Sequence, residues 1–184
     1  MNNIFLTYGG LITPLGNTVE ENFTAMLEGD SGVQKVSNSG FNNEDWPLGK
    51  ITGLKGENRY NELLNLLCDS LIERHGSSLF NAKDTLVIIS STKANIDALP
   101  NDTFASTREI LHNKLQLKND PIIISNACIS GVMAINSAAD YVSSGKYANA
   151  VVIGIDALSD FIIYGFQSLF ALSSESSKPF DKNR

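Results

Sequence analysis

A cysteine stands where a predicted buried strand passes into a predicted helix. The segment Ile124–Ala139 reads ISNACISGVMAINSAA, and an aliphatic run that starts at Ile122 precedes Cys128. A cysteine thiolate is a nucleophile, and the positive end of a helix dipole favours the thiolate. The N–H groups of a first helical turn can also stabilise a developing oxyanion. The position therefore suits acyl transfer through a thioester. The spacing of Cys128 from the predicted strand and helix is also compatible with a small cysteine buried in the core.

The other cysteine and both histidines are predicted to be structural. Cys68 falls inside an amphipathic helix pattern, between Leu64 and Leu71, where a small apolar core residue is expected. Two cysteines so far apart make no disulfide framework, which favours a reducing cytoplasm. His75 and His112 are isolated and lack the spacing of metal ligands, so we expect no metal and no cofactor.

Short apolar runs alternate with amphipathic helix patterns along the chain. This alternation predicts an α/β fold with a mostly parallel sheet that helices cover on both faces. A capping box, Thr18 with Glu21, starts the first predicted helix, and Gly29 ends it. Strands are predicted at 4–11, 85–91, 121–125 and 150–155, helices at 17–29, 59–76, 106–117 and 128–143, and mainly loop at 30–58.

The helix that follows Cys128 has no polar face in its first three turns. A helix that is apolar all round is expected to be buried all round. Cys128 would then lie at the N-terminus of a buried central helix, above the carboxyl end of a strand. In open α/β sheets, this edge is where ligands bind.

Composition restricts the classes of partner. The chain has 184 residues, 42% of them hydrophobic, and a formal net charge of −6, which suits one compact domain over residues 1–184. The acidic balance argues against nucleic acid and against an anionic membrane as partners. No apolar run reaches the roughly 20 residues of a spanning helix, and the first residues lack the basic region of a signal peptide.

Three blocks of the sequence resemble the N-terminal half of the β-ketoacyl synthases, in the thiolase-like superfamily. LITPLGNTVEENFTAMLEGDSGV is similar to the opening strand, turn and first helix of that family. SNACISGVMAINSAADYVSSGKYANAVVIGIDALS is similar to its nucleophile block, and GFQSLFALSSESSKPFDKNR to the stretch that leads to a Pro-Phe-Asp signature. The three blocks occur in the family's order and together cover most of the chain.

The resemblance implies a decarboxylating Claisen condensation in fatty-acid or polyketide synthesis. Cys128 would take an acyl group from an acyl-carrier-protein thioester, and the carbanion of a decarboxylated malonyl thioester would attack it. Phe166 matches an aromatic position that lines the acyl pocket, and Ile129 replaces a small residue and could narrow its mouth. The family also implies a homodimer, or a heterodimer with another ketosynthase subunit, in which the strand at 121–125 pairs with its twin.

Departures from the family limit what the chain is expected to do alone. The sequence ends at Arg184, and the family's second half, which carries two histidines, a lysine and another oxyanion donor, is absent. The chain by itself is expected not to complete a condensation. Its sheet edge and an apolar helix face are expected to need a partner or self-association. Asp156, in a turn that differs from the family's, is expected to be a hydrogen-bonding residue rather than a catalytic acid.

Two alternatives stay open. The chain could be a coenzyme-A-dependent acyltransferase of the same fold, although the Pro-Phe-Asp ending favours the carrier-protein branch. It could also be a non-catalytic partner subunit in a ketosynthase heterodimer. Subunits of that kind commonly lack the cysteine, and this chain keeps it.

Overall fold

The computed structural model describes residues 3–54, 58–175, 178 and 180–182. These residues form two compact units, which are treated separately below. The first consists of Met1–Thr7 and Lys55–Ala157, and the second of Tyr8–Leu54 and Leu158–Arg184. Pro179 of the Pro-Phe-Asp signature lies outside the described residues. That residues 1–184 form one domain stays a prediction.

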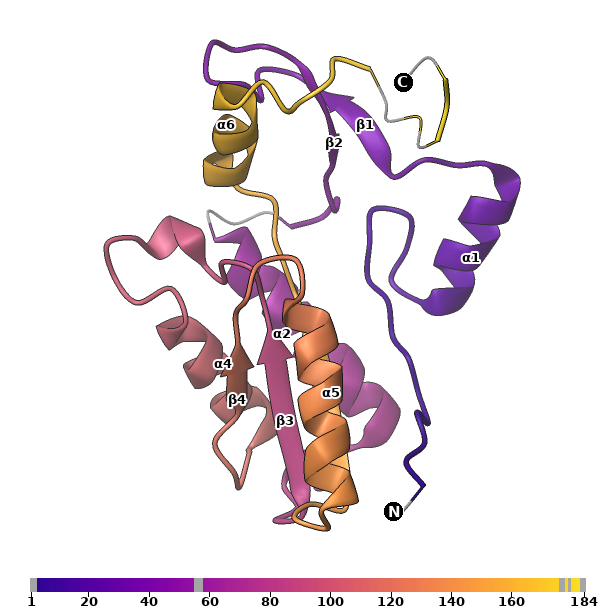
Figure 1. Ribbon diagram of the computed structural model, residues 1–184, viewed down its shortest axis with the longest axis vertical. Helices are drawn as coiled ribbons and strands as arrows, with labels where there is room; N and C mark the ends of the chain where they lie inside the picture. The colour runs from indigo at the N-terminus through magenta and orange to yellow at the C-terminus, as the bar shows by residue number, and fades with distance from the viewer. Residues whose placement is uncertain (1–2, 55–57, 176–177, 179, 183–184) are drawn as a thin grey trace. The chain divides into compact units, whose positions relative to one another are not determined.

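A three-stranded parallel sheet is the centre of the first unit (Figure 1). Strand β3 (Thr85–Ser90) lies between β4 (Ile122–Ile124) and β5 (Asn149–Gly154). Ile88 is paired with Ile122 on one side and with Val152 on the other. All six residues of β3 are buried, as expected for a continuous apolar run between two parallel neighbours. The sequence therefore predicted these three strands correctly.

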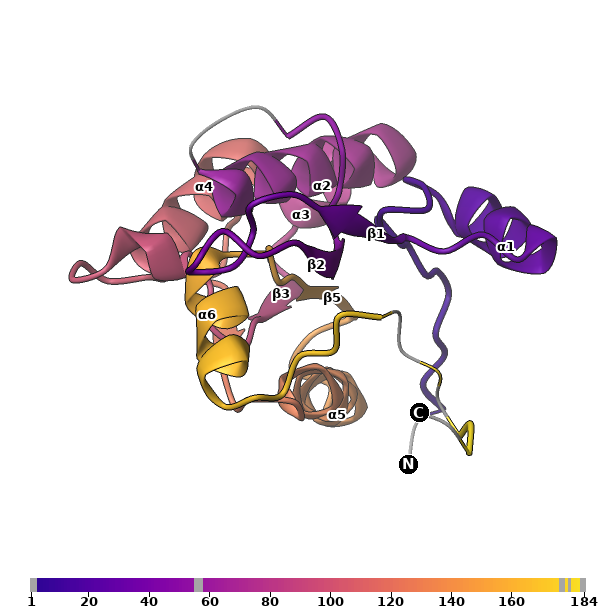
Figure 2. The same cartoon turned by 90° about the horizontal axis from the view of Figure 1, so that it is seen from above.

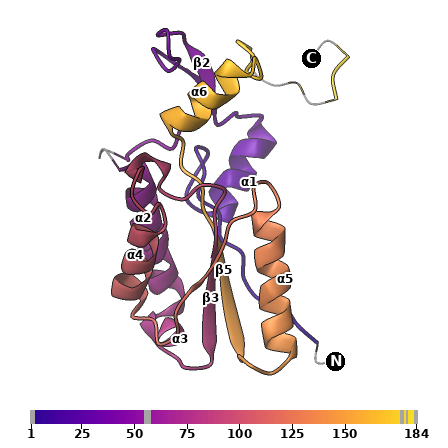
Figure 3. The ribbon, with the colours of Figure 1, turned by 60° about the vertical axis from the view of Figure 1, so that its left-hand side comes forward.

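Helices cover both faces of this sheet, which confirms the predicted α/β class. Helices α2 (Arg59–His75) and α4 (Ala105–Leu115) lie on one face, and α5 (Ser130–Ser143) lies on the other (Figures 2 and 3). Two short elements, α3 (Ser77–Phe80) and the 3-10 helix η1 (Ile96–Ala98), complete the unit. None of the described helices is long and apolar enough to cross a membrane.

Two layers of core form because strand side chains alternate between the faces of the sheet. On one face, Leu86 and Ile88 pack with Ala134 and Ala138 of α5. The small alanines let the helix approach the sheet closely. On the other side, helices α2 and α4 contribute fully buried side chains, namely Leu64, Cys68, Leu111 and Leu115.

The expectation that the helix after Cys128 is buried all round is wrong for this chain. Ala134 and Ala138 are buried, but Val132 is 61% exposed and Ile135 is 59% exposed. A helix that lies on one sheet face buries only the side turned towards that sheet, whatever the composition of its other side. The expectation of an exposed apolar helix face is confirmed.

The second unit contains helix α1 (Val19–Glu28), strands β1 (Val33–Val36) and β2 (Trp46–Gly49), and helix α6 (Asp160–Ser168). The capping box of α1 and its glycine end are confirmed, with Gly29 in the left-handed region. The prediction that residues 30–58 are mainly loop holds for most of the described part of this segment, but it missed β1 and β2, which form an antiparallel pair with Val33 opposite Gly49.

The prediction of a strand at residues 4–11 is also wrong. These residues have no regular secondary structure, and Phe5 and Leu6 are 75% and 92% exposed. A strand forms only where a neighbouring strand accepts its hydrogen bonds, and the described sheets pair nothing with this segment. Gly9 and Gly10 further lower its strand propensity.

Candidate active site

Cys128 lies in a tight turn between β4 and α5. The strand ends at Ile124 and the helix begins at Ser130. Ala127 has φ of +45°, a left-handed conformation that is uncommon for a residue with a side chain. The backbone N–H of Ile129 donates to the carbonyl of Asn126 at 3.2 Å. This turn leaves Cys128 exposed at the carboxyl edge of the parallel sheet.

The hydroxyl of Ser130 holds this turn together. Ser130 Oγ accepts a hydrogen bond from the backbone N–H of Asn126 and donates one to the carbonyl of Ala127, both at 2.7 Å. Ser130 itself is 4% exposed. The turn around the cysteine is therefore fixed by a buried side chain as well as by backbone hydrogen bonds.

The two cysteines have opposite environments. Cys68 is fully buried, and burial together with the nearby charge of Asp69 raises the pKa of its thiol to about 12. A thiol with that pKa stays protonated and unreactive at neutral pH. Cys128 is exposed beside the N-terminus of a 14-residue helix. The prediction that Cys68 is structural is confirmed, and only Cys128 has the exposure that a nucleophile needs.

A polar network lies at the carboxyl ends of β3 and β5. The carboxylate of Asp156 accepts hydrogen bonds from Ser91 Oγ at 3.0 Å and from Thr92 Oγ1 at 2.7 Å. Lys93 Nζ lies 3.1 Å from Asp156 Oδ1, and the Lys93 side chain is only 10% exposed. This confirms that Asp156 is a hydrogen-bonding residue. The partners could not be deduced from the sequence, because they lie more than 60 residues before it.

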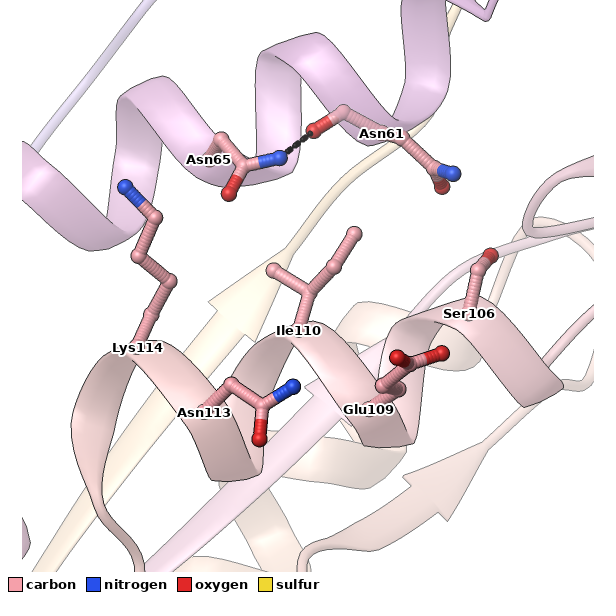
Figure 4. Close-up of a pocket in the computed structure, with 7 residues that line it drawn as sticks. All are labelled: Asn61, Asn65, Ser106, Glu109, Ile110, Asn113 and Lys114. Atoms are coloured by element: carbon pink, nitrogen blue, oxygen red, sulfur yellow. Dashed lines mark hydrogen bonds between the residues drawn. The ribbon is translucent and has the colours of Figure 1, made fainter.

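A groove between α2 and α4 has a different character (Figure 4). It lies on the opposite face of the sheet from α5 (Figure 3). Its wall is mostly amide and charged side chains, and Asn65 Nδ2 donates to the carbonyl of Asn61 at 2.8 Å. No thiol contributes to it, so this groove is not the candidate site. The residues that line it are Asn61, Asn65, Ser106, Glu109, Ile110, Asn113 and Lys114.

The remaining predicted residues come from separate elements of the chain. Ile129 follows Cys128 in the turn and is 53% exposed, whereas Phe166 is in α6 of the second unit and 48% exposed. Their roles at an acyl pocket stay predictions. His112 Nε2 lies 3.1 Å from Asp120 Oδ1 at the surface of the first unit, and His75 is the last residue of α2. Both histidines are ordinary polar helix positions, as predicted.

The fold and the site thus define the first unit as an α/β structure with an exposed cysteine in a strand-to-helix turn. A family model described as 3-oxoacyl-[acyl-carrier-protein (ACP)] synthase III matches residues 124–172, which include Cys128 and all of α6. The sequence relatives and solved structures that match this chain are also β-ketoacyl synthases or ketosynthases.

Curated relatives of this chain carry the name β-ketoacyl-[acyl-carrier-protein] synthase III. The protein numbered 2 of Bacteroides thetaiotaomicron is 28% identical over 141 residues, which are 71% of this chain and 39% of the relative. The protein of Phocaeicola vulgatus is 27% identical over the same length, with the same shares covered. The chain therefore spans about two fifths of the length of these relatives.

Two solved structures share the fold. The ketosynthase ApeO of Xenorhabdus doucetiae, solved in complex with its chain length factor ApeC, superposes with a TM-score of 0.75 at 22% identity. A β-ketoacyl synthase of Burkholderia phymatum has a TM-score of 0.69 at 17% identity. Each match covers 95% of this chain, and 52% and 53% of the solved chains. The chain thus shares the fold of these ketosynthases and is similar in sequence to β-ketoacyl-[acyl-carrier-protein] synthases III, which confirms the resemblance found in its sequence.

Proposed function

We propose that this chain is the acyl-accepting part of a β-ketoacyl-[acyl-carrier-protein] synthase, with Cys128 as the nucleophile. The observation that carries the proposal is the exposed thiol in a fixed turn at the N-terminus of α5. The family match to 3-oxoacyl synthase III spans this same turn.

The acyl-transfer step follows from the position of the thiol. The Cys128 thiolate attacks the carbonyl carbon of an acyl thioester, and a sulfur–carbon bond forms as the bond to the donor's sulfur breaks. The proton lost from Cys128 ends on the released thiol. The helix dipole of α5 stabilises the attacking thiolate, and N–H groups at the start of the helix stabilise the developing oxyanion. Ile129 and Phe166 are proposed to line the acyl chain's path.

The condensation with a malonyl thioester is assigned to the assembled synthase. The chain spans between 39% and 53% of the length of the relatives reported above. We therefore assign acyl loading to this chain and decarboxylative condensation, in fatty-acid or polyketide synthesis, to the whole protein. A cytoplasmic location is part of the same proposal.

A second ketosynthase-type chain is the proposed protein partner. Strand β4 is at the edge of its sheet, and α5 exposes apolar side chains. An unpaired strand edge and an exposed apolar patch both favour association. The complex of ApeO with its chain length factor is an example of such pairing in a structural neighbour. A homodimer and a heterodimer are both compatible with these surfaces.

The donor class is tested by competition. Equimolar acyl-carrier-protein and acyl-coenzyme A, with acyl groups that differ by isotope, are offered to the chain, and the Cys128 peptide is analysed by mass spectrometry. The proposal predicts that the carrier-protein label dominates. A dominant coenzyme A label would instead support the coenzyme-A-dependent alternative. Labelling of neither kind, with Cys128 still open to alkylation, would favour a non-catalytic partner subunit.

A further inference from the structure

We infer that Asp156 is a positioning residue for the Cys128 turn, acting through the loop after β3. The inference rests on the proposed role of Cys128 as acyl acceptor. It assigns to Asp156 the task of holding three strand ends in one arrangement, so that the turn presents its thiol in a fixed direction.

The first link joins the end of β5 to the end of β3. Asp156 Oδ1 accepts hydrogen bonds from Ser91 Oγ, from the backbone N–H of Thr92 at 3.1 Å and from Thr92 Oγ1. The backbone N–H of Ile155, one residue earlier, donates to the carbonyl of Ser90 at 3.0 Å. One carboxylate oxygen thus fixes both the backbone and the side chain of the residue that follows Ser91.

The second link joins the end of β3 to the end of β4. The backbone N–H of Ser91 donates to the carbonyl of Ile124 at 3.2 Å, and Ser125 Oγ donates to the carbonyl of Thr92 at 3.4 Å. Ser125 is three residues before Cys128. The residue that Asp156 holds most tightly, Thr92, therefore contacts the first residue of the cysteine turn directly.

Charge makes the carboxylate difficult to replace. The Lys93 side chain is 90% covered, and its ammonium lies 3.1 Å from Asp156 Oδ1. A charge removed from water is costly unless a partner of opposite sign remains beside it. Loss of the carboxylate would drive Lys93 towards solvent and move the Thr92 backbone with it. The same loop would then no longer support Ser125.

Asp156 acts through these residues and not as a catalytic acid. Its Oδ1 is occupied by four donors, and Oδ2 has one longer contact of 3.3 Å to the N–H of Thr92. Asp156→Asn keeps an acceptor oxygen for Ser91 and Thr92 and places an amide nitrogen only where Oδ2 was. Asp156→Ala removes every contact. The pair of variants separates the hydrogen-bonding role of Asp156 from the role of its charge.

The test compares the reactivity of Cys128 in folded variants of the 184-residue chain. Alkylation by iodoacetamide and acylation by an acyl-carrier-protein thioester are both followed by intact mass at a temperature where circular dichroism shows native structure. The matched control is Asn119→Ala. Asn119 Nδ2 bridges the carbonyls of Lys83 and Thr85 at 3.0 and 2.9 Å, at the opposite end of β3.

The inference predicts that Asp156→Ala slows both reactions by about tenfold to 100-fold, the size expected for a displaced reacting group. Asp156→Asn keeps the acceptor oxygen but not the charge beside Lys93, so its rates are expected to fall between those of Asp156→Ala and the wild type. Asn119→Ala lowers the melting temperature but leaves both rates unchanged. Adding Ser125→Ala to Asp156→Ala is expected to slow the two reactions little further, because Asp156 and Ser125 both act through their hydrogen bonds to Thr92.

Equal rates in wild type and Asp156→Ala overturn the inference, as does an equal slowing in Asn119→Ala. A wild-type chain that is alkylated at Cys128 but never acylated contradicts the proposed function alone, because the alkylation rates still decide the role of Asp156. If Cys128 of the wild type reacts with neither iodoacetamide nor the acyl thioester, the proposed function and the inference about Asp156 are both overturned.

Discussion

The hydroxyl of Ser130 and the backbone N–H of Asn126 lie 2.7 Å apart, across the turn that contains Cys128. The same hydroxyl donates to the carbonyl of Ala127, whose left-handed backbone makes the turn. A side chain four residues after Asn126 therefore determines the path of the backbone around the thiol. This relationship explains how a short sequence can hold a cysteine exposed in a strand-to-helix turn.

Ser130→Ala is expected to loosen the turn. The part-buried hydrogen bond from the backbone N–H of Asn126 to the Ser130 hydroxyl would be lost, which costs about 0.5–1.5 kcal/mol in the free energy of unfolding. Alkylation of Cys128 should slow in parallel. Urea unfolding and alkylation kinetics measure the two effects. Ser143→Ala, which removes a hydroxyl from the last turn of the same helix, should stay within about 0.5 kcal/mol of the wild type. An unchanged unfolding midpoint in Ser130→Ala would contradict this account.

Two buried groups predict a loss of stability at alkaline pH. Burial and the charge of Asp69 raise the pKa of Cys68 from 9.0 to about 12, and burial raises the pKa of Tyr60 from 10.0 to about 12 despite its hydrogen bond to Thr107. Both folded pKa values exceed the unfolded ones. Their contribution is therefore complete below about pH 9 and is lost as the pH rises towards 12. Each group adds a slope of at most about 1.4 kcal/mol per pH unit.

Urea titrations between pH 8 and pH 11 test this slope. The double variant Cys68→Ala, Tyr60→Phe should show a flatter decline of stability with pH than the wild type. A double variant with the same slope as the wild type would show that neither group ionises on unfolding in this range.

Glu44 predicts an acid-sensitive interaction in the second unit. Desolvation by itself would raise the pKa of the Glu44 carboxyl. Hydrogen bonds from the Gln167 side chain, from the backbone of Glu44 and from the side chain and backbone of Asn42 outweigh this effect and lower the pKa from 4.5 to about 2. Because the folded pKa is the lower one, the stabilising contribution is present above about pH 4.5 and is lost as the pH falls through 2. Gln167→Ala should reduce the difference in unfolding midpoint between pH 5 and pH 2.5.

The control for this variant is Gln34→Ala, on the exposed strand β1. Gln167 Oε1 also accepts a 3.1 Å hydrogen bond from the N–H of Phe41, so the variant is expected to be less stable at both pH values. Only the change in pH dependence tests the Glu44 interaction. If the difference in unfolding midpoint between pH 5 and pH 2.5 is the same in Gln167→Ala as in the wild type, the Glu44–Gln167 interaction is not the source of the acid sensitivity.

The exposed face of α5 predicts self-association. Val132 and Ile135 are more than half exposed, and the edge strand β4 lies in the same unit. Light scattering at rising concentration should show a mass above that of the 19.9 kDa chain. Val132→Asp should shift the equilibrium towards monomer, and Asn136→Asp, which adds the same charge to an exposed polar position of α5, should not. A monomer at every concentration, or equal effects of both variants, argues against this surface.

The sequence predicted the first unit well because its signals are local. The run Leu86–Ile89 is apolar throughout and favours a buried strand, and the pattern of α2 repeats over 17 residues. The β1–β2 pair was missed because each strand has four residues and β2 contains Pro47, which weakens its strand signal. The strand at 4–11 was wrong because a local apolar run does not reveal whether a neighbouring strand is available.

The candidate site was predictable only in part, for the same reason. A cysteine after Ile122–Ile124 and before a helix identifies the turn, but it does not reveal that Ser130 closes it. Asp156 contacts residues 63 to 65 positions away in the sequence, which no local pattern predicts. The apolar surface of α5 was correctly recognised, yet composition does not show which part of the surface is covered.

The central claim is that Cys128 accepts acyl groups, and intact-mass analysis after incubation with an acyl-carrier-protein thioester tests it most directly. Wild type and Cys68→Ala should each gain one acyl mass, whereas Cys128→Ala should gain none, and the adduct should be on the peptide that contains Cys128. An adduct that persists in Cys128→Ala, or that disappears equally in Cys68→Ala, would contradict the account.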